Sequence, residues 1–435
     1  MKSLIVGNGA REHAIAERMA EGSELYAFIS KKNPGIAKIC KEFEIGDLLD
    51  FDKIKKFADK VEPDYVFVGP EGPLAKGIVD ALEYEVVGPN ENLAKLESDK
   101  GFCKEFMKRH LGRGYPQFEV CTSYTEAKNA IDALDKVVVK PGGLTAGKGV
   151  KVMGQQLESK EDAKEYAREV LEKKIGGIEK VVIEEKINGE EFTLQAFTDG
   201  VRLAPMPLVQ DHKHAYENDA GPMTGGMGSY SDSDHLLPFL NATDHKEALK
   251  IMEDTIDAIR KTGRYRGVLY GGFMLTKDGP KLLEYNVRFG DPEAMNVLSL
   301  LKTDFSDVCI SILDGNLKNV EFEQKATVCK YLVPKGYPTH PEPLAEVFVD
   351  KKRIEEMGAR LYYASVNERN GKVYTSTSRS FGIVGIAKTL DEAERITERA
   401  ISTVNSDKLV HRSDIGGKEL IEKRIKHMRE LRDEF

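Results

Sequence analysis

The segment with the clearest chemical pattern is LLEYNVR at residues 282–288. Side chains alternate between the two faces of a β-strand, so Glu284, Asn286 and Arg288 project to one side, opposite the apolar residues at 283, 285 and 287. A carboxylate and a carboxamide supply the oxygen ligands that Mg²⁺ prefers, and an arginine beside them can bind a carboxylate or a phosphate. The pattern therefore predicts a site for a metal ion and an anion. Taken alone, it also fits an antiparallel strand with one face in water.

A glycine-rich segment lies upstream, KVVVKPGGLTAGKGVKV at residues 136–152. The β-branched runs 137–139 and 150–152 predict the two strands of a hairpin. Glycines in the connecting loop allow backbone N–H groups to approach phosphate oxygens, and Lys140 and Lys148 bring positive charge to both ends of the loop. The segment predicts a phosphate-binding hairpin, with an ordinary glycine-rich turn as the alternative.

The same loop also matches the G-x-x-x-x-G-K spacing of a P-loop, from Gly142 to Lys148. A P-loop continues with Ser or Thr, which ligates Mg²⁺, and then with a helix. Here Gly149 follows, and a strand is predicted next. A hairpin that closes over a triphosphate is therefore the better interpretation.

A third segment, VVIEEKINGEEFTL at residues 181–194, predicts an apolar strand, a short polar connector with Gly189, and a second strand. The connector exposes backbone donors and acceptors that can read an adenine edge, and Glu191 can accept hydrogen bonds from ribose hydroxyls. Charged surface hairpins of this composition are common, so the segment gains weight only beside the other two.

The first hundred residues predict a small doubly wound α/β unit. Its G-N-G turn at residues 7–9 lies between a buried strand and a helix over 10–21, an arrangement shared with NAD-dependent oxidoreductases. Two observations argue against that class: Glu12 replaces the third glycine of the motif, and Ser30-Lys31-Lys32 stands where an acidic ribose-binding residue is needed. Backbone amides at the start of the helix still favour a phosphate. Further strands are expected near 25–29, 65–68 and 86–87.

The composition is that of an ordinary globular protein. With 435 residues, of which 40% are hydrophobic, the chain is long enough for about two to four domains. Its net charge of −8 gives no general reason to expect nucleic-acid binding. The five cysteines show no C-x-x-C spacing, which favours reduced packing residues over a zinc site or disulfides. The first residues lead directly into a strand and no apolar run is long enough for a membrane span, so the cytoplasm is the expected compartment.

After residue 320 the pattern changes to short strands with proline and glycine turns, near 327–333, 360–365, 372–377 and 381–387. This predicts a small, mostly β domain at one end of the site. From Lys418 onward, apolar residues recur at helical spacing among many charges, which predicts an amphipathic helix that packs on this domain.

In this order, the three nucleotide-type segments resemble those of the ATP-grasp ligases. Further segments narrow the resemblance to the phosphoribosylamine–glycine ligase family: VGNGAREH at 6–13, VGPEGPL at 68–74, AGKGV at 146–150, QDHK at 210–213, GP at 221–222, TGGMG at 224–228 and RFGDPE at 288–293. HRSDIG at 411–416 continues the similarity, so the resemblance covers the whole chain.

The resemblance implies an α/β fold with three domains. Residues 1–98 would form the doubly wound parallel-sheet domain, which binds substrate. Residues 99–320 would form an ATP-grasp domain of the α+β type, with a flexible lid over about 118–190, and residues 321–435 the small, mostly β C-terminal domain.

The implied reaction ligates glycine to 5-phospho-D-ribosylamine in de novo purine biosynthesis, giving N1-(5-phospho-D-ribosyl)glycinamide, ADP and phosphate. A carboxylate is a poor acyl donor because its leaving group would be oxide, so ATP first converts glycine to glycyl phosphate. The amine then displaces phosphate, and no step needs a protein nucleophile. The cofactors would be ATP and Mg²⁺ or Mn²⁺. The partners would be the two small-molecule substrates, without nucleic acid or membrane, and the protein would be a monomer or weak homodimer.

The resemblance also implies roles for single residues, with catalysis by positioning and charge neutralisation. Glu284 and Asn286 would hold the metal ion. Arg288 would face the phosphoryl group or the glycine carboxylate, Lys148 would steady the phosphates and Asp211 would pair with the glycine ammonium, so these three are the candidate catalytic residues. The nucleotide-binding residues would be Lys100, Lys140, Gly147, Lys148, Glu184, Glu185, Ile187 and Glu191. The substrate-binding residues would be Gly9, Arg11, Glu12, Pro70, Glu71, Gly72, Asp211, Lys213, Gly226, Arg288, Asp291 and Glu293.

The chain departs from the commoner family pattern at three positions. Gly142 stands where aspartate is usual, and Ala220 and Met223 replace threonine and asparagine. Two rival functions also remain. Another ATP-grasp ligase, such as a carboxylating enzyme of purine synthesis, would share the nucleotide and metal residues but lack the segments at 211–213 and 224–228. A non-catalytic nucleotide-binding module would not need the metal and arginine residues together.

Overall fold

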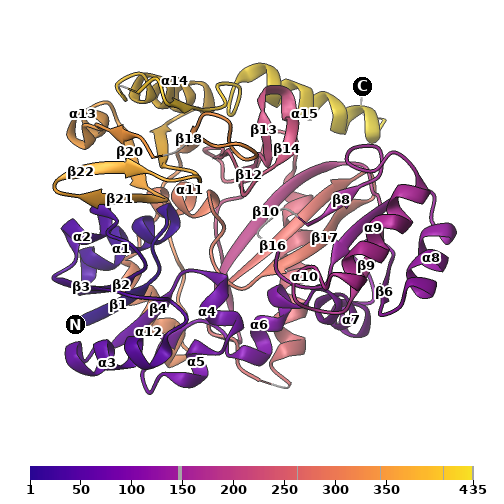
Figure 1. The fold of residues 1–435 in the computed structure, drawn as a ribbon, viewed down its shortest axis with the longest axis horizontal. Helices are drawn as coiled ribbons and strands as arrows, with labels where there is room; N and C mark the ends of the chain where they lie inside the picture. Colours follow the sequence, from indigo (N-terminus) through magenta and orange to yellow (C-terminus); the bar gives the residue numbers. More distant parts are fainter. Residues whose placement is uncertain (146–148, 262, 343, 405, 434–435) are drawn as a thin grey trace.

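The computed structural model describes residues 1–145, 149–261, 263–342, 344–404 and 406–433. The N-terminal and C-terminal regions lie side by side, and the central region lies beside both (Figure 1). Within these ranges, the helices are too short or too polar to cross a bilayer.

The N-terminal region is a five-stranded parallel sheet covered by helices. Its strands, in spatial order, are β3 (Glu42–Ile45), β2 (Glu24–Ile29), β1 (Lys2–Val6), β4 (Tyr65–Val68) and β5 (Val86–Val87). Its helices are α1 (Ala10–Gly22), α2 (Pro34–Ile39), α3 (Phe51–Val61), α4 (Glu71–Ala75) and α5 (Ile78–Ala81). The doubly wound prediction is confirmed. The half-exposed edge strand β3, with the sequence EFEI, was not predicted because it lacks a clear apolar pattern.

A second, antiparallel sheet carries the glycine-rich hairpin. Its strands, in spatial order, are β6 (Phe118–Cys121), β9 (Val181–Glu185), β7 (Val137–Pro141) and β8 (Lys151–Val152). β7 pairs with β8, as the two β-branched runs predict. α6 (Glu91–Ser98) and α7 (Lys100–His110) precede this sheet, and α8 (Tyr124–Ala133) and α9 (Lys160–Glu172) pack on it.

A third, antiparallel sheet contains, in spatial order, β11 (Leu203–Pro205), β10 (Glu190–Thr198), β16 (Gly267–Thr276) and β17 (Gly279–Asn286). The connector at 186–189 therefore joins two different sheets, and the expected strand pair at 181–194 is not a hairpin. The reason is that β9 already pairs with β6 and β7 on its two edges, so β10 pairs with β16 instead.

β17 presents the metal-type residues on one face and core residues on the other. Glu284 is opposite Gly272 and Leu282 is opposite Phe273, so Leu283 is the extra residue of a β-bulge. Leu282 is fully buried and Leu283 only half-buried, which makes the predicted core position of Leu283 wrong by this one-residue shift. From Glu284 onward, the predicted alternation is confirmed.

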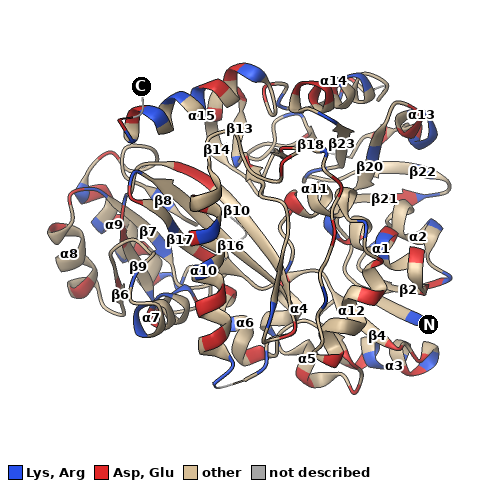
Figure 2. Ribbon diagram, turned by 180° about the vertical axis from the view of Figure 1, so that it is seen from behind, with Lys and Arg blue, Asp and Glu red and all other residues tan. Residues whose placement is uncertain are grey.

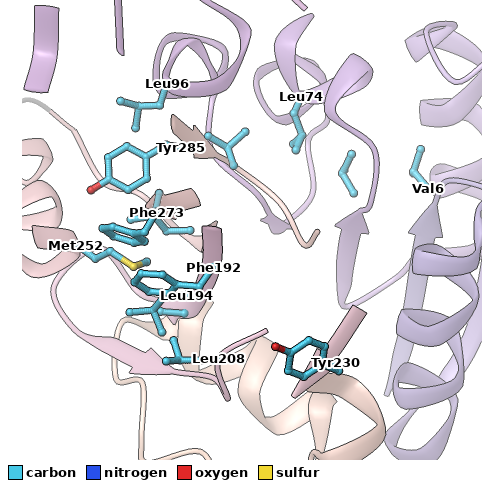
Figure 3. Close-up of a cluster of buried hydrophobic side chains, with 14 of the residues drawn as sticks. Val6, Leu74, Leu96, Phe192, Leu194, Leu208, Tyr230, Met252, Phe273 and Tyr285 are labelled. Atoms are coloured by element: carbon cyan, nitrogen blue, oxygen red, sulfur yellow. The ribbon is translucent and has the colours of Figure 1, made fainter. Parts of the chain in front are cut away.

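The core behind β17 combines aromatic rings with leucine and methionine side chains (Figure 3). The rings of Phe192 and Phe273 stack with their centroids 5.3 Å apart, and Met252 of α10 (Ala242–Ile259) lies beside them. The Tyr285 hydroxyl lies 2.5 Å from Thr255 Oγ1 on the same helix. These contacts hold β17 from its apolar side.

The C-terminal region is built on a sheet with the spatial order β12 (Gln210–Asp211), β15 (Gly228–Ser231), β18 (Ala326–Pro334), β23 (Phe381–Ala387) and β20 (Ala359–Tyr363), with β24 (Leu409–Val410) also paired to β18. A smaller sheet contains β19 (Glu346–Val347), β22 (Lys372–Thr375) and β21 (Val366–Arg369), and the helices are α13 (Lys351–Glu356) and α14 (Leu390–Ile401). β12 and β15 come from the central part of the chain, and they place Asp211 at one end of this sheet.

Three further elements join the regions. α1 packs on α11 (Glu293–Leu300) and α12 (Phe305–Asp314), which attaches the N-terminal sheet to the central region. β13 (His214–Tyr216), the 3₁₀ helix η1 (Glu217–Asp219) and β14 (Ala220–Met223) form a hairpin. The predicted amphipathic helix is α15 (Lys418–Leu431), which extends from the C-terminal region over this hairpin toward the central sheet (Figure 1).

Candidate active site

A buried group of three charges lies on the β7–β9 sheet. Lys140 Nζ is 2.8 Å from one carboxylate oxygen of Glu184, and Lys104 Nζ of α7 is 2.5 Å from the other. Burial alone would raise the pKa of Glu184, but the two lysines lower it below its ordinary value. The Glu184 side chain therefore pairs with Lys140 in the protein interior and is not exposed to solvent. Lys104 was missed, although its position one helical turn after Lys100 puts both on one face of α7.

Lys100 lies against the start of the glycine-rich loop. Its Nζ donates to the Gly143 carbonyl at 2.8 Å, and its backbone N–H donates to the Gly142 carbonyl at 2.7 Å. A Cβ atom on Gly142 would lie 3.0 Å from the Lys180 carbonyl oxygen, so a side chain at this position would make a tight contact. Two other predicted residues of the loop, Gly147 and Lys148, lie outside the described residues.

Cations from separate parts of the chain influence the charge of Glu284. Burial alone would raise its pKa, but Lys213, Lys140, Lys100 and Arg288 lower it below its ordinary value. Among the described residues, no side chain or backbone group forms a hydrogen bond with the side chain of Glu284 or Asn286. The Glu284 carboxylate is therefore ionised, and its oxygens are available to an added cation.

The predicted adenosine-side residues lie at the end of β9 and the start of β10. The Glu185 carboxylate accepts from the Gln117 backbone N–H at 2.8 Å, and Ile187 is half-buried in the connector. Glu191 accepts from Lys213 Nζ at 2.7 Å. Burial alone would lower the pKa of Lys213, but Glu191 and other anions raise it well above its ordinary value. The structure thus brings the segment at 211–213 beside the start of β10, which carries the predicted ribose-binding residue Glu191.

Arg288 links the end of β17 to the N-terminal region. It donates to Glu97 of α6 at 2.7 Å, its Nε lies 3.4 Å from Glu71, and Glu71 lies 3.6 Å from Arg11. Glu97 also accepts from the Val287 backbone N–H at 2.8 Å. Arg288 is therefore engaged by protein carboxylates. Glu97 was missed because an isolated helical glutamate carries no local signal.

The turn before α1 is occupied by Glu12. The Gly9 N–H donates to Glu12 Oε2 at 2.5 Å, and Arg11 Nε donates to Glu12 Oε1 at 2.6 Å. The Gly9 amide that we expected to favour a phosphate is thus already hydrogen-bonded to a carboxylate. Nearby, Pro70 occupies the N-cap position of α4, and the space around the Cα of Gly72 is open.

Arg379 connects the C-terminal region to the loop at 224–228. It donates to the Gly225 carbonyl at 2.6 Å, to the Gly226 carbonyl at 2.9 Å and to the Asp291 carboxylate at 2.9 Å. A Cβ on Gly226, where φ is +105°, would lie 2.7 Å from Asp211 Oδ1, so this position requires glycine. Arg379 was missed because its partners are more than 80 residues away in the sequence.

Asp211, which is half-buried, and Glu293, which is buried, are two acidic residues whose charges influence each other. Glu293 accepts from the Tyr270 hydroxyl at 2.9 Å. Asp211 Oδ1 is buried and has no hydrogen-bond partner among the described residues. Burial, followed by the charge of Glu293, raises the pKa of Asp211 well above its ordinary value. A buried acceptor without a donor is suited to an added cationic group.

The chain has a doubly wound domain followed by two antiparallel sheets, and lysines and carboxylates of these sheets face one another. This arrangement defines an ATP-grasp enzyme. Three family models match the chain: the N domain of phosphoribosylglycinamide synthetase over residues 1–97, its ATP-grasp (A) domain over 98–294 and its C domain over 327–418. The phosphoribosylamine–glycine ligase of Methanobrevibacter smithii is 51% identical over 99% of this chain and 100% of that protein, and the one of Methanocaldococcus jannaschii is 50% identical over the same shares. The chain belongs to the phosphoribosylamine–glycine ligase family.

Solved structures agree with this assignment. A phosphoribosylamine–glycine ligase from Thermotoga maritima has a TM-score of 0.81 and 29% identity, covering 95% of this chain and 100% of that one. A biotin carboxylase domain of 2-oxoglutarate carboxylase from Hydrogenobacter thermophilus has a TM-score of 0.72 at 16% identity, covering 100% of this chain and 95% of that one. The second likeness concerns the fold alone.

Proposed function

We propose that the protein ligates glycine to 5-phospho-D-ribosylamine with ATP, the reaction for which its relatives are named. A glycine carboxylate oxygen attacks the γ-phosphorus and ADP leaves. The amine then attacks the glycyl carbonyl carbon, and phosphate leaves as the C–N bond forms. The observation that carries the proposal is the unpaired, ionised carboxylate of Glu284 among four cations, because such a charge pattern suits a metal-bound polyphosphate.

The residues of β17 fit a divalent metal ion. Glu284 and Asn286 offer hard oxygens as metal ligands. Elsewhere in the described residues, no group of three or more His, Cys, Asp or Glu is arranged to hold a metal ion. Mg²⁺ suits this donor set because it accepts few protein ligands and keeps phosphates and water. The carboxylase domain noted above was solved with MgADP. When bound, the ion neutralises and orients the β- and γ-phosphates. Mn²⁺ is the alternative.

The remaining assignments are those that the family resemblance implies. We propose that Lys100, Lys140, Gly147 and Lys148 contact the phosphates. The backbone near Glu184, Glu185 and Ile187 would contact adenine, and the Glu191 carboxylate the ribose. The residues proposed to lie near the phosphoribosylamine and glycine are Gly9, Arg11, Glu12, Pro70, Glu71, Gly72, Asp211, Lys213, Gly226, Arg288, Asp291 and Glu293. We propose the same domain division at 98/99 and 320/321.

The function is tested with purified protein, ATP, Mg²⁺ and glycine, scored for ADP release. We expect release to depend on both glycine and phosphoribosylamine. Release that depends on bicarbonate instead would favour a carboxylating ATP-grasp ligase. Nucleotide binding without any turnover would favour a binding module.

Replacing Asp211 with asparagine is expected to stabilise the free protein while nearly abolishing glycine use. The folded-state pKa of Asp211 is raised, so its stabilising contribution is present below the unfolded value of about 4 and is lost as pH rises through the folded value. At neutral pH the carboxylate therefore costs stability, and an amide removes that cost.

The measurement is the thermal midpoint at several pH values, with and without glycine. We expect the midpoint of Asp211→Asn to exceed that of the wild type increasingly from pH about 4 upward. Saturating glycine should raise the midpoint of the wild type and leave that of the variant unchanged, because the ammonium group loses its partner. Equal stabilisation of both proteins by glycine contradicts the assignment of Asp211.

We also propose a monomer or weak homodimer in the cytoplasm. All five cysteines are unpaired, which is compatible with a reducing compartment. Sedimentation at several protein concentrations distinguishes a monomer from a weak dimer.

A further inference from the structure

Arg424 of α15 joins two acidic residues from different parts of the chain. Its Nη1 lies 3.2 Å from Glu190 Oε2 at the start of β10, and its Nη2 pairs with Asp219 of η1. The Arg424 side chain is 17% exposed and the Glu190 side chain 6%. Figure 2 shows charged residues along α15 where it passes over the hairpin and the central sheet. The helix thus contacts the central region through charges.

Both partners of Arg424 lie close to residues of the proposed site. Glu190 immediately precedes Glu191, and Asp219 belongs to the hairpin that follows Lys213. His212, the neighbour of Lys213, has its Nδ1 3.4 Å from Asp219. Arg424 therefore bridges the two segments that carry the Lys213–Glu191 ion pair, which spans 2.7 Å.

Backbone contacts already join the two segments: Thr193 pairs with Val209, and Gln210 Nε2 donates to the Glu191 carbonyl at 3.0 Å. The Lys213–Glu191 ion pair itself adds little, because its side chains are 32% and 46% exposed. Arg424, which is half-buried and bridges two carboxylates, is a firmer connection, since its guanidinium has fixed donor directions. Arg424 therefore adds a side-chain restraint on the relative position of Lys213 and Glu191 to these backbone contacts.

We propose that Arg424 is a positioning residue that fixes Lys213 and Glu191 relative to each other and so sets the affinity of the site for ATP and glycine. The inference rests on the proposed function, in which Glu191 contacts ATP and Lys213 lies near glycine and phosphoribosylamine. On this proposal, α15 contributes to substrate binding although it does not contact the reacting groups.

The substitution Arg424→Gln leaves each carboxylate with another partner. Asp219 keeps Arg412 at 3.0 Å, and Glu190 keeps His427 at 2.5 Å. The protein is therefore expected to fold. Arg424→Lys retains the charge but can reach one carboxylate at a time. Arg429→Gln on the same helix is the matched control, because Arg429 is exposed.

The experiment measures kcat and the KM values for ATP and glycine in the full-length protein. We expect Arg424→Gln to raise at least one KM about 10- to 100-fold with a smaller change in kcat, and Arg424→Lys to restore part of the loss. Arg429→Gln should behave as the wild type. A lower kcat with unchanged KM values would indicate a loss of folded enzyme and would overturn the inference.

A double substitution separates the inference from the proposed function. Lys213→Met should itself raise KM for glycine, and Arg424→Gln should then add little to that KM, because the residue through which it acts is gone. If Lys213→Met leaves the KM for glycine unchanged, the proposed role of Lys213 is wrong. Suppose instead that Lys213→Met raises the KM for glycine, and that adding Arg424→Gln to this variant raises the KM by the same factor as in the wild type. The proposed role of Arg424 is then wrong.

Discussion

Replacing Glu284 with glutamine is expected to reduce ATP turnover about 1000-fold and to leave the fold intact. The substitution keeps the shape of the side chain but removes the negative charge that lies among Lys213, Lys140, Lys100 and Arg288. An amide is a poor ligand for a divalent cation in a carboxylate position. The loss should therefore appear in kcat for both glycine-dependent ADP release and ligation.

The control for Glu284 is Glu119→Gln. Glu119 is an exposed residue of β6, and the substitution makes the same change in net charge. The circular dichroism spectrum of both variants should match that of the wild type. Near-normal turnover by a folded Glu284→Gln protein would remove the basis for the metal assignment.

Replacing Glu184 with glutamine should cause the largest loss of stability among single charge-neutralising changes near the site. Lys104, Lys140 and Glu184 are all nearly fully buried, and the carboxylate contacts both ammonium groups. Without the carboxylate, two like charges remain buried close together. Removing one partner of a buried ion pair costs about 3–5 kcal/mol in the free energy of unfolding. Lys140 should also lose its fixed position, so KM for ATP should rise.

The measurement is urea unfolding together with ATP kinetics. The neighbouring residue supplies the control, because Glu185 is half-buried and accepts one hydrogen bond, from Gln117, that an amide oxygen can also accept. Glu185→Gln is therefore expected to change the free energy of unfolding by about 0.5 kcal/mol or less. A Glu184→Gln protein as stable as the Glu185→Gln protein would show that the three charges are not coupled as their distances indicate.

Local sequence patterns were sufficient for the elements that carry chemistry on one strand or one loop. The alternation from Glu284 to Val287, the β7–β8 hairpin and the doubly wound N-terminal sheet were predicted from residue periodicity and turn residues, and the structure confirms them. The predictions from sequence failed where the conformation of a segment depends on the strand that pairs with it. The bulge at Leu283 depends on pairing with β16, and the separation of β9 from β10 depends on β9 having both edges occupied.

The sequence alone therefore yielded predictions of the residues that bind ATP, a metal ion and an anion, because residue type and spacing within one element are local properties. The folded chain was needed to show what holds those residues. Lys104 against Glu184, Arg379 against Asp291 and Arg424 against Asp219 join positions about 80 or more residues apart, and such contacts leave no periodic trace in the sequence. Their partners are chosen by the packing of sheets and helices, which no single segment encodes.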